Sequence, residues 1–266
     1  MTDEERFDVV LEELRGLMTA LGDFAGSVVL IGGQVVALQQ KQRVGNGSID
    51  IQTSVGVVVS RGFSLDSDLL LAFDGTAHEQ RGEEFPAILR SRGFTRSNPD
   101  TRWLKTVGDV AVPIDLFVTP DLALDAYPTR ATVLYDGDLA ASRPTRLEVP
   151  LRAGMLEIQV PNPLGYLALK VDAKLRRRPA QTKDSFDLFA FVQTMGADVA
   201  GGALRDSRAH GPRVADELKQ LFCSPSAAGV QDVVTYSRTS LGPAERALLE
   251  QAAVDLFAEV LRVAVR

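Results

Sequence analysis

Two acidic residues two positions apart, Asp66 and Asp68, stand directly before the apolar run Leu69–Leu71. A short apolar run of this kind is typical of a buried strand, and side chains at positions i and i+2 of a strand point to the same face. Both carboxylates are therefore expected to look into one space. Two carboxylates held in this way suit a pair of divalent cations about 3.5–4 Å apart. The stretch predicts a strand that carries one side of a cation site.

A glycine pair, Gly32-Gly33, separates the apolar run Ser27–Ile31 from a segment that begins like a helix at Gln34. A strand, a glycine pair and a helix in this order bring backbone N–H groups and the positive end of a helix toward one point, where a phosphate can bind. Taken alone, the pair favours the simpler alternative, which is an ordinary tight turn from strand to helix.

A third acid, Asp115, lies inside the most strand-like segment of the chain, Val110–Val118. A carboxylate in an apolar strand is costly to bury unless a cation or hydrogen-bond donors accompany it. Two interpretations stay open at this point. Asp115 belongs with the first two acids in a cation site, or it is bonded to backbone amides or paired with an arginine.

Hydrophobic periodicity divides the chain near residue 160. Before it, the patterns indicate helices over residues 3–22 and 79–92 among short strands, with a hairpin over residues 147–160. After it, the periodicity is helical, and a long final helix is expected over residues 244–265. The expected fold is α/β (α+β), with one domain over residues 1–160 and a helical domain over residues 161–266.

Composition excludes several classes of protein. The chain of 266 residues is 45% hydrophobic, with no apolar run as long as a membrane span and an acidic N-terminal stretch, so we expect a cytoplasmic protein without membrane contact. A single cysteine, Cys223, excludes an internal disulfide and a multi-cysteine zinc site. Two distant histidines, His78 and His210, make a histidine-rich metal centre an unsuitable interpretation.

A basic stretch over Lys170–Lys183 contrasts with the net charge of −6. Lys170 and Lys174 are four residues apart and therefore share one side of a helix. Arg176–Arg178 are equally typical of a solvated helix end. The acids that follow, Asp184 and Asp187, can belong to the same site or form ordinary surface pairs with neighbouring lysines.

Together, these segments resemble the nucleotidyltransferase superfamily that shares the palm of DNA polymerase β. The closer resemblance is to the AbiEii-type branch, the nucleotidyltransferase toxins of abortive-infection and MenT-like toxin–antitoxin systems. It is carried by Arg61-Gly-Phe-Ser-Leu-Asp-Ser-Asp68 and by Lys183-Asp-Ser-Phe-Asp187. The first element is one residue longer than the commonest form, and the gap between Gly33 and Asp66 is long for the superfamily.

The resemblance implies a palm domain with a mixed, twisted sheet flanked by helices, followed by a helical half. It implies that Asp66 and Asp68 hold Mg²⁺ on a nucleoside triphosphate, and that Asp115 completes a second metal site and helps to deprotonate the attacking hydroxyl. The remaining residues that it assigns to the nucleotide are Gly32, Gly33, Arg61 and Ser64 on the first wall of the cleft, and Lys170, Lys183 and Asp184 on the helical side. It also counts Lys170 and Asp187 among the catalytic residues.

The expected activity is Mg²⁺-dependent transfer of a nucleoside monophosphate from a nucleoside triphosphate to an acceptor hydroxyl, with release of pyrophosphate. The favoured acceptor is the 3′ end of an RNA such as tRNA, by analogy with the toxins, and an antitoxin protein is a candidate partner. Two alternatives stay open. One is an adenylyltransferase that modifies a small molecule or a protein, and the other is a non-catalytic module that senses a nucleotide.

Overall fold

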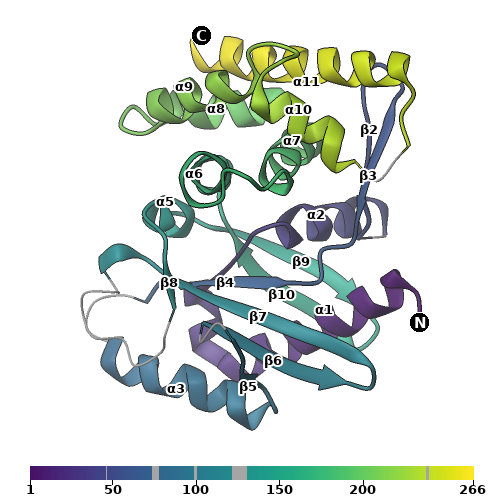
Figure 1. Cartoon of the computed structure of the whole chain (residues 1–266). Helices are drawn as coiled ribbons and strands as arrows, with labels where there is room; N and C mark the ends of the chain where they lie inside the picture. Colours follow the sequence, from purple (N-terminus) through teal and green to yellow (C-terminus); the bar gives the residue numbers. More distant parts are fainter. Residues whose placement is uncertain (46, 74–77, 99–100, 122–130, 238–239) are drawn as a thin grey trace. The chain divides into compact units, whose positions relative to one another are not determined.

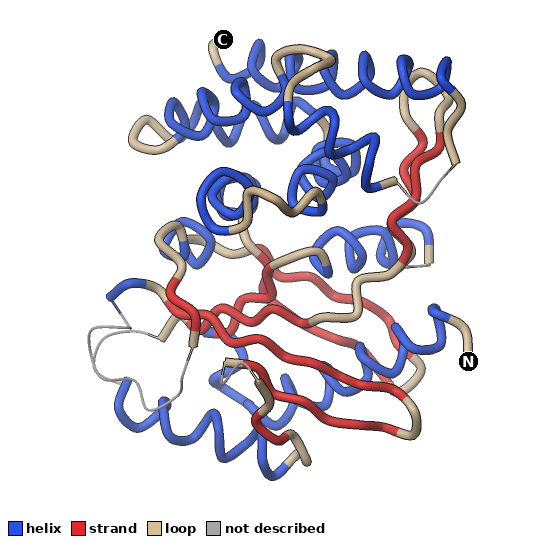
Figure 2. Tube along the Cα trace, viewed as in Figure 1, coloured by secondary structure: helices blue, strands red, loops and turns tan. Residues whose placement is uncertain are grey.

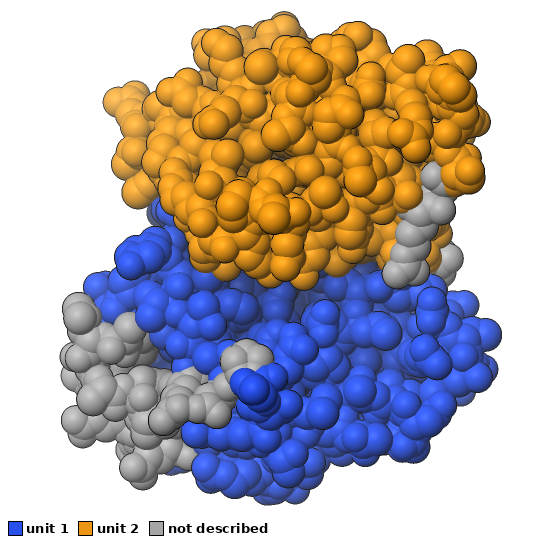
Figure 3. All heavy atoms as spheres, viewed as in Figure 1, with its two compact units in different colours: residues 1–47, 63–165 blue, residues 48–62, 166–266 orange. Residues whose placement is uncertain are grey.

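The computed structural model describes residues 1–45, 47–73, 78–98, 101–121, 131–237 and 240–266. The chain divides into two compact units. Unit 1 comprises residues 1–47 and 63–165, and unit 2 comprises residues 48–62 and 166–266 (Figure 3).

Unit 1 contains a mixed β-sheet with helices on both faces (Figures 1 and 2). Its elements are α1 (Asp3–Leu21), a 3₁₀ turn (Gly22–Ser27), β1 (Val28–Ile31), α2 (Gln34–Val44), β4 (Ser67–Leu71), α3 (His78–Ser91), β5 (Thr95–Arg96), β6 (Arg102–Val107), β7 (Val110–Val118), β8 (Thr132–Val133), α5 (Gly137–Ala141), β9 (Thr145–Leu151), β10 (Gly154–Val160) and the first turn of α6 (Pro163–Asp172).

The strands of the described part of unit 1 follow the order β5-β6-β7-β4-β1-β10-β9, and β8 also pairs with β7. The pairs β4–β7, β7–β8 and β1–β10 are parallel, and the others are antiparallel. β1 is buried at all four of its positions, so both faces of the sheet are covered there. Figure 1 shows α1 and α3 along one face and α2 against the other. The predicted mixed sheet flanked by helices is confirmed.

Local sequence explains the main elements of unit 1. The buried residues of α1, from Phe7 to Leu21, recur at helical spacing, and Thr2 with Glu5 forms a capping box at its start. Buried positions alternate with more exposed ones along Val110–Val118, which is the period of a strand with one covered face. The helices and strands predicted here from periodicity are confirmed, with boundaries that differ by a few residues.

Unit 2 is mainly helical. Its elements are β2 (Ile49–Gln52), β3 (Val58–Gly62), the remainder of α6, a π-helical turn (Ala173–Arg177), α7 (Lys183–Met195), α8 (Ala197–Asp206), α9 (Gly211–Phe222), α10 (Ala228–Tyr236) and α11 (Pro243–Ala264). Its core is rich in phenylalanine: Phe222 of α9 stacks on Phe257 of α11, with ring centroids 3.7 Å apart. The long helix predicted over residues 244–265 is confirmed, since α11 covers Pro243–Ala264.

The division of the chain differs from the expected domains in one respect. The change from unit 1 to unit 2 after Gly165 lies close to the expected boundary at residue 160, but the hairpin β2–β3 belongs to unit 2 instead of the first domain. The hairpin buries Ile49, Ile51 and Val59, and β2 contacts α7. Burial of this apolar face against helices that follow much later in the chain explains its place in unit 2.

Within the described residues, no helix has both the length and the apolar character needed to cross a membrane. Cys223 follows the end of α9, where its thiol is free and exposed.

Two neighbouring glycines of α8 allow a test of the packing in unit 2. A Cβ added to Gly201 would lie 2.6 Å from the carbonyl oxygen of Val260 in α11, whereas the nearest atom to a Cβ at Gly202 is 3.7 Å away. We expect Gly201→Ala to lower the free energy of unfolding by about 1–3 kcal/mol, because α8 and α11 must separate. We expect Gly202→Ala to raise it by up to about 1 kcal/mol through helix propensity. Chemical denaturation measures both, and a gain in stability for Gly201→Ala would contradict this packing.

Candidate functional site

Two of the three predicted acids lie side by side on neighbouring strands of unit 1. β4 and β7 are parallel, and their register pairs Asp68 with Asp115. On both strands the acid is less buried than the residues before and after it, so the two side chains project from the same face of the sheet. The structure therefore brings together two acids that are 47 positions apart in the sequence.

The third acid, Asp66, lies just before β4, since the strand begins at Ser67. The expectation that Asp66 and Asp68 occupy two positions of one strand is therefore wrong by one residue, because strand pairing with β1 extends only from Asp68 to Leu71. Asp66 is nevertheless close to the other acids: its Oδ1 is 3.9 Å from Nη2 of Arg102, the residue that contacts Asp115. Its side chain is 54% exposed.

Arg102 is the cation beside these three acids. It lies directly opposite Asp115 in the antiparallel pair β6–β7, where Nε donates to Oδ1 over 2.8 Å and Nη2 donates to Oδ2 over 2.6 Å. The hydrogen bonds to Asp115, helped by the charges of Asp66 and Asp68, raise the pKa of Arg102 above its ordinary value. The arginine-paired interpretation of Asp115, left open by the sequence, is thus the one seen in the structure.

Sequence reasoning missed Arg102, although a signal was available. The two-residue turn Gly108-Asp109 joins β6 to β7, and Gly108 has the positive φ of 61° that such a turn favours. Once the strands are paired across this turn, the register that joins Val107 to Val110 also joins Arg102 to Asp115. A count outward from the glycine would have placed the arginine opposite the acid.

The glycine turn of unit 1 lies against Asp68. Ile31, the last residue of β1, pairs with Asp68, and Gly32 follows with a φ of +80°. A Cβ at Gly32 would lie only 2.1 Å from Oδ2 of Asp68. Two features therefore favour glycine at position 32. Its positive φ is unfavourable for other residues, and the carboxylate of Asp68 occupies the space that a Cβ would need. The predicted turn from strand to helix is confirmed.

Gly33 caps α2, and the first residue of this helix is tied to the acid-bearing strand. The buried side chain of Gln34 accepts a hydrogen bond of 3.0 Å from the hydroxyl of Ser67, which lies between the two acids. This contact, which sequence reasoning also missed, holds the start of α2 beside the start of β4. Ser64 is buried, and its expected contact with a phosphate stays a prediction.

The acids agree in chemistry with a magnesium site, because Mg²⁺ prefers carboxylate oxygens. Among the residues that the structure describes, however, no group of three or more aspartate, glutamate, histidine or cysteine side chains is arranged to hold a metal ion. The guanidinium of Arg102 lies where it neutralises the acids instead. A metal ion held by the three carboxylates would lie beside this guanidinium, whose positive charge opposes its binding.

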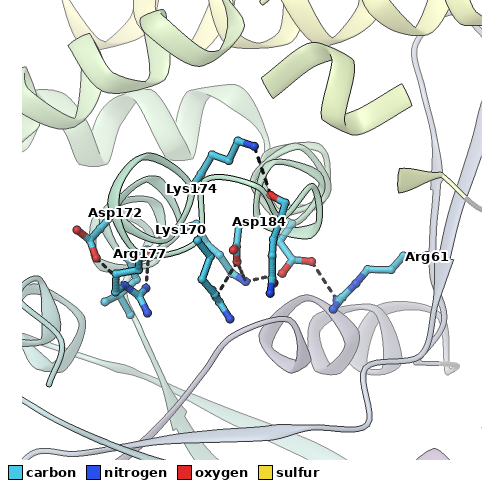
Figure 4. A network of polar contacts seen from close by, with 10 residues as sticks. Arg61, Lys170, Asp172, Lys174, Arg177 and Asp184 are labelled. Atoms are coloured by element: carbon cyan, nitrogen blue, oxygen red, sulfur yellow. Dashed lines mark hydrogen bonds and ion pairs between the residues drawn. The ribbon is translucent and has the colours of Figure 1, made fainter. Parts of the chain in front are cut away.

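A second cluster of predicted residues is buried in unit 2. Nζ of Lys170, on α6, donates to Oδ1 of Asp184 over 3.2 Å and to Oδ2 of Asp187, both on α7 (Figure 4). All three side chains are buried. Burial by itself would lower the pKa of Lys170, but the charges of Asp187 and Asp184 outweigh this and raise it. The alternative that Asp184 and Asp187 form surface pairs is therefore wrong.

Arg61, on β3, completes this cluster. Its Nη1 is 2.9 Å from Oδ1 of Asp187, and its guanidinium lies over the ring of Tyr236, 6.0 Å from the centroid. Burial would lower the pKa of Arg61, but the charge of Asp187 and a hydrogen bond with Tyr236 raise it. Burial would raise the pKa of Asp184, but the charges of Lys170 and Arg178, with a smaller contribution from Lys183 at the start of α7, lower it. The roles of these residues on a nucleotide stay predictions.

The basic stretch is engaged with acids inside unit 2. Nζ of Lys174 is 2.6 Å from Asp232, and Arg178 is 3.0 Å from Asp184. Arg177 donates to Asp172 over 2.7 Å (Figure 4), and Arg176 pairs with Asp172 and Glu217. These cations compensate charges of unit 2, so they give little support to a basic surface for RNA.

A surface hollow of unit 1, about 730 Å³ in volume, lies among Glu5, Glu12, Arg92 and Arg152. Its lining includes none of the three predicted acids, Asp66, Asp68 and Asp115.

Comparison of this chain with protein-family models, with curated proteins and with solved structures finds no match.

The contact between Gly32 and Asp68 predicts a difference between two glycines with nearly the same positive φ. Gly45 also has a positive φ, of 83°, but a Cβ there would meet no atom within 4 Å. Gly45→Ala is expected to lower the free energy of unfolding by about 1–2 kcal/mol, from backbone strain alone. Gly32→Ala is expected to cost about 1 kcal/mol more, because the carboxylate of Asp68 must also move. Urea denaturation compares them, and equal losses would contradict the close contact.

The buried cluster of unit 2 predicts that its lysine is needed for stability. Lys170→Met is expected to lower the free energy of unfolding by about 3 kcal/mol, because Asp184 and Asp187 lose a buried partner. The control is Lys183→Met, at a less buried position of the same unit, with an expected change within about 0.5 kcal/mol. Adding Asp187→Asn to Lys170→Met should recover part of the loss. A double variant no more stable than Lys170→Met would contradict the charge-pair explanation.

Proposed function

We propose that this chain is a Mg²⁺-dependent nucleotidyltransferase of the type found in AbiEii-like toxins, which moves a nucleoside monophosphate from a nucleoside triphosphate to an acceptor hydroxyl. The observation that carries the proposal is the register of β4 and β7, which sets Asp68 beside Asp115 next to the glycine turn. Acids on neighbouring strands at the start of a helix are the parts that a metal-bound triphosphate requires.

Each of these residues has a role that follows from its position. Asp66, Asp68 and Asp115 would hold Mg²⁺, which when bound neutralises charge on the triphosphate and lowers the pKa of the attacking hydroxyl. Gly32 and Gly33 present backbone N–H groups at the start of α2, which has 11 residues and an aligned helix dipole. Gln34 and Ser67 act as positioning residues, because their hydrogen bond keeps this helix start beside Asp68.

The proposed acceptor is the 3′ end of an RNA such as tRNA, and the proposed biological role is that of a toxin. This part of the proposal rests on the resemblance carried by the stretch from Arg61 to Asp68 and by the stretch from Lys183 to Asp187. The ion pairs of Arg176, Arg177 and Arg178 remove the basic stretch as an argument for RNA. An adenylyltransferase of a small molecule or protein uses the same chemistry, so only the acceptor separates the two.

One observation favours a second candidate, a nucleotide-sensing module without catalysis. Both carboxylate oxygens of Asp115 accept hydrogen bonds from Arg102, so this acid is already neutralised without a metal ion. A module that binds a nucleotide but transfers nothing would tolerate such a permanent pair.

A transfer assay separates the candidates. The protein is incubated with Mg²⁺ and each of the four α-labelled nucleoside triphosphates, with total RNA, with a metabolite extract or alone. We expect label to enter RNA. Asp68→Asn should lower the rate on the order of a hundredfold or more, because a metal-ligating carboxylate is lost. Asp109→Asn, at the exposed turn between β6 and β7, is the control and should keep the wild-type rate.

The location of the label decides among the functions. Label on the protein or on a small molecule would support the adenylyltransferase. Binding of a labelled nucleotide without any transfer would support the sensing module. A wild-type rate for Asp68→Asn would contradict the proposed site, whichever acceptor is found.

A further inference from the structure

Arg102 forms hydrogen bonds with Asp115, one of the three acids of unit 1 proposed to bind a metal ion. Its Nε and Nη2 donate to different oxygens of Asp115, and Nη2 also lies 3.9 Å from Asp66. This pairing takes up two of the roughly four acceptor positions of the carboxylate, and the positive guanidinium repels a cation that approaches the remaining ones. A free divalent ion must therefore compete electrostatically with Arg102 for Asp115.

The ion pair is placed so that it can exchange partners. The side chain of Arg102 is 36% exposed and that of Asp115 is 18% exposed, whereas Lys170 in unit 2 is almost entirely buried. Breaking a partly exposed pair costs less than breaking a buried one, since water solvates the separated groups. The same exposure leaves the guanidinium accessible to an anion from solution.

A phosphate group offers Arg102 a replacement for Asp115. The planar guanidinium binds carboxylate and phosphate with the same two-pronged geometry. A triphosphate with its bound metal ion supplies new partners for both groups: the metal ion for the carboxylates and the phosphate for Arg102. A free metal ion supplies a partner for the carboxylates alone.

We propose that Arg102 selects the metal–triphosphate complex over the free metal ion, by exchanging the carboxylate of Asp115 for a phosphate oxygen. This inference rests on the proposed function, because it assumes that Asp66, Asp68 and Asp115 bind a metal ion. It assigns to Arg102 both a resting role, as the counter-ion of three acids, and a binding role toward the triphosphate.

Calorimetric titration with two probes tests this proposal without any catalytic step. The first probe is MnCl₂ alone, and the second is MnCl₂ with tripolyphosphate, which carries the triphosphate charge without a base. Arg102→Gln is expected to bind Mn²⁺ alone about tenfold more tightly, because the competing cation is gone. It is expected to bind the Mn²⁺–tripolyphosphate complex about tenfold more weakly, because the phosphate loses its partner.

The opposite signs of the two changes distinguish selection from a structural role, since loss of a supporting residue would weaken both. The matched control is Arg146→Gln, a half-exposed arginine on β9 of unit 1 that pairs with Glu148 and Glu157. It removes the same charge from the same unit and should change neither affinity. Thermal unfolding gives a second readout: added Mn²⁺ should stabilise Arg102→Gln more than the wild type.

Asp68→Asn separates failure of this inference from failure of the proposed function. If Asp68→Asn abolishes Mn²⁺ binding but Arg102→Gln leaves both affinities unchanged, the metal site stands and the role of Arg102 is refuted. If Asp68→Asn leaves Mn²⁺ binding at the wild-type level, the metal site itself is refuted, and the inference with it. Should Arg102→Gln not fold, Arg102→Ala removes the same charge with a smaller side chain. A folded Arg102→Ala with no gain in affinity for Mn²⁺ alone would also refute the inference.

Discussion

The parallel pairing of β4 with β7 is the contact on which the arrangement of unit 1 depends. Parallel strands cannot be joined by a tight turn, so the chain must leave β4 and cross over before it returns as β7. The crossover contains α3, β5 and β6, and β6 then pairs with β7 on the side away from β4. These two pairings together bring Asp68, Asp115 and Arg102 side by side on three consecutive strands of the sheet.

The two units compensate their charges in different ways. In unit 2, Lys170 and its acidic partners are buried, and a change to any one member unbalances charges that are shielded from water. In unit 1, Arg102 and the acids around it keep contact with water. A site that must accept a ligand needs charges that can exchange partners at low cost, and the charges around Arg102 meet this condition better than those around Lys170.

Much of the fold of unit 1 could be predicted, because each element has a local signal. The alternation along Val110–Val118 indicated β7, and the glycine pair indicated the turn into α2. The sequence predicted the acids and the glycine turn of the candidate site. It did not predict Arg102 or the hydrogen bond between Gln34 and Ser67. The acids are unusual in their apolar surroundings and therefore stand out, whereas an arginine in a polar strand and a serine between two acids do not.

The sequence by itself determined which segments form helices and strands and which faces of them are apolar, because these properties depend on neighbours a few residues away. Only the tertiary structure decided the partners of distant segments: Asp68 for Asp115, Lys170 for Asp184 and Asp187, and the helices of unit 2 for the hairpin at residues 49–62. An ion pair or an apolar contact between distant segments depends on how whole elements pack, and residue spacing along the chain carries little information about that packing.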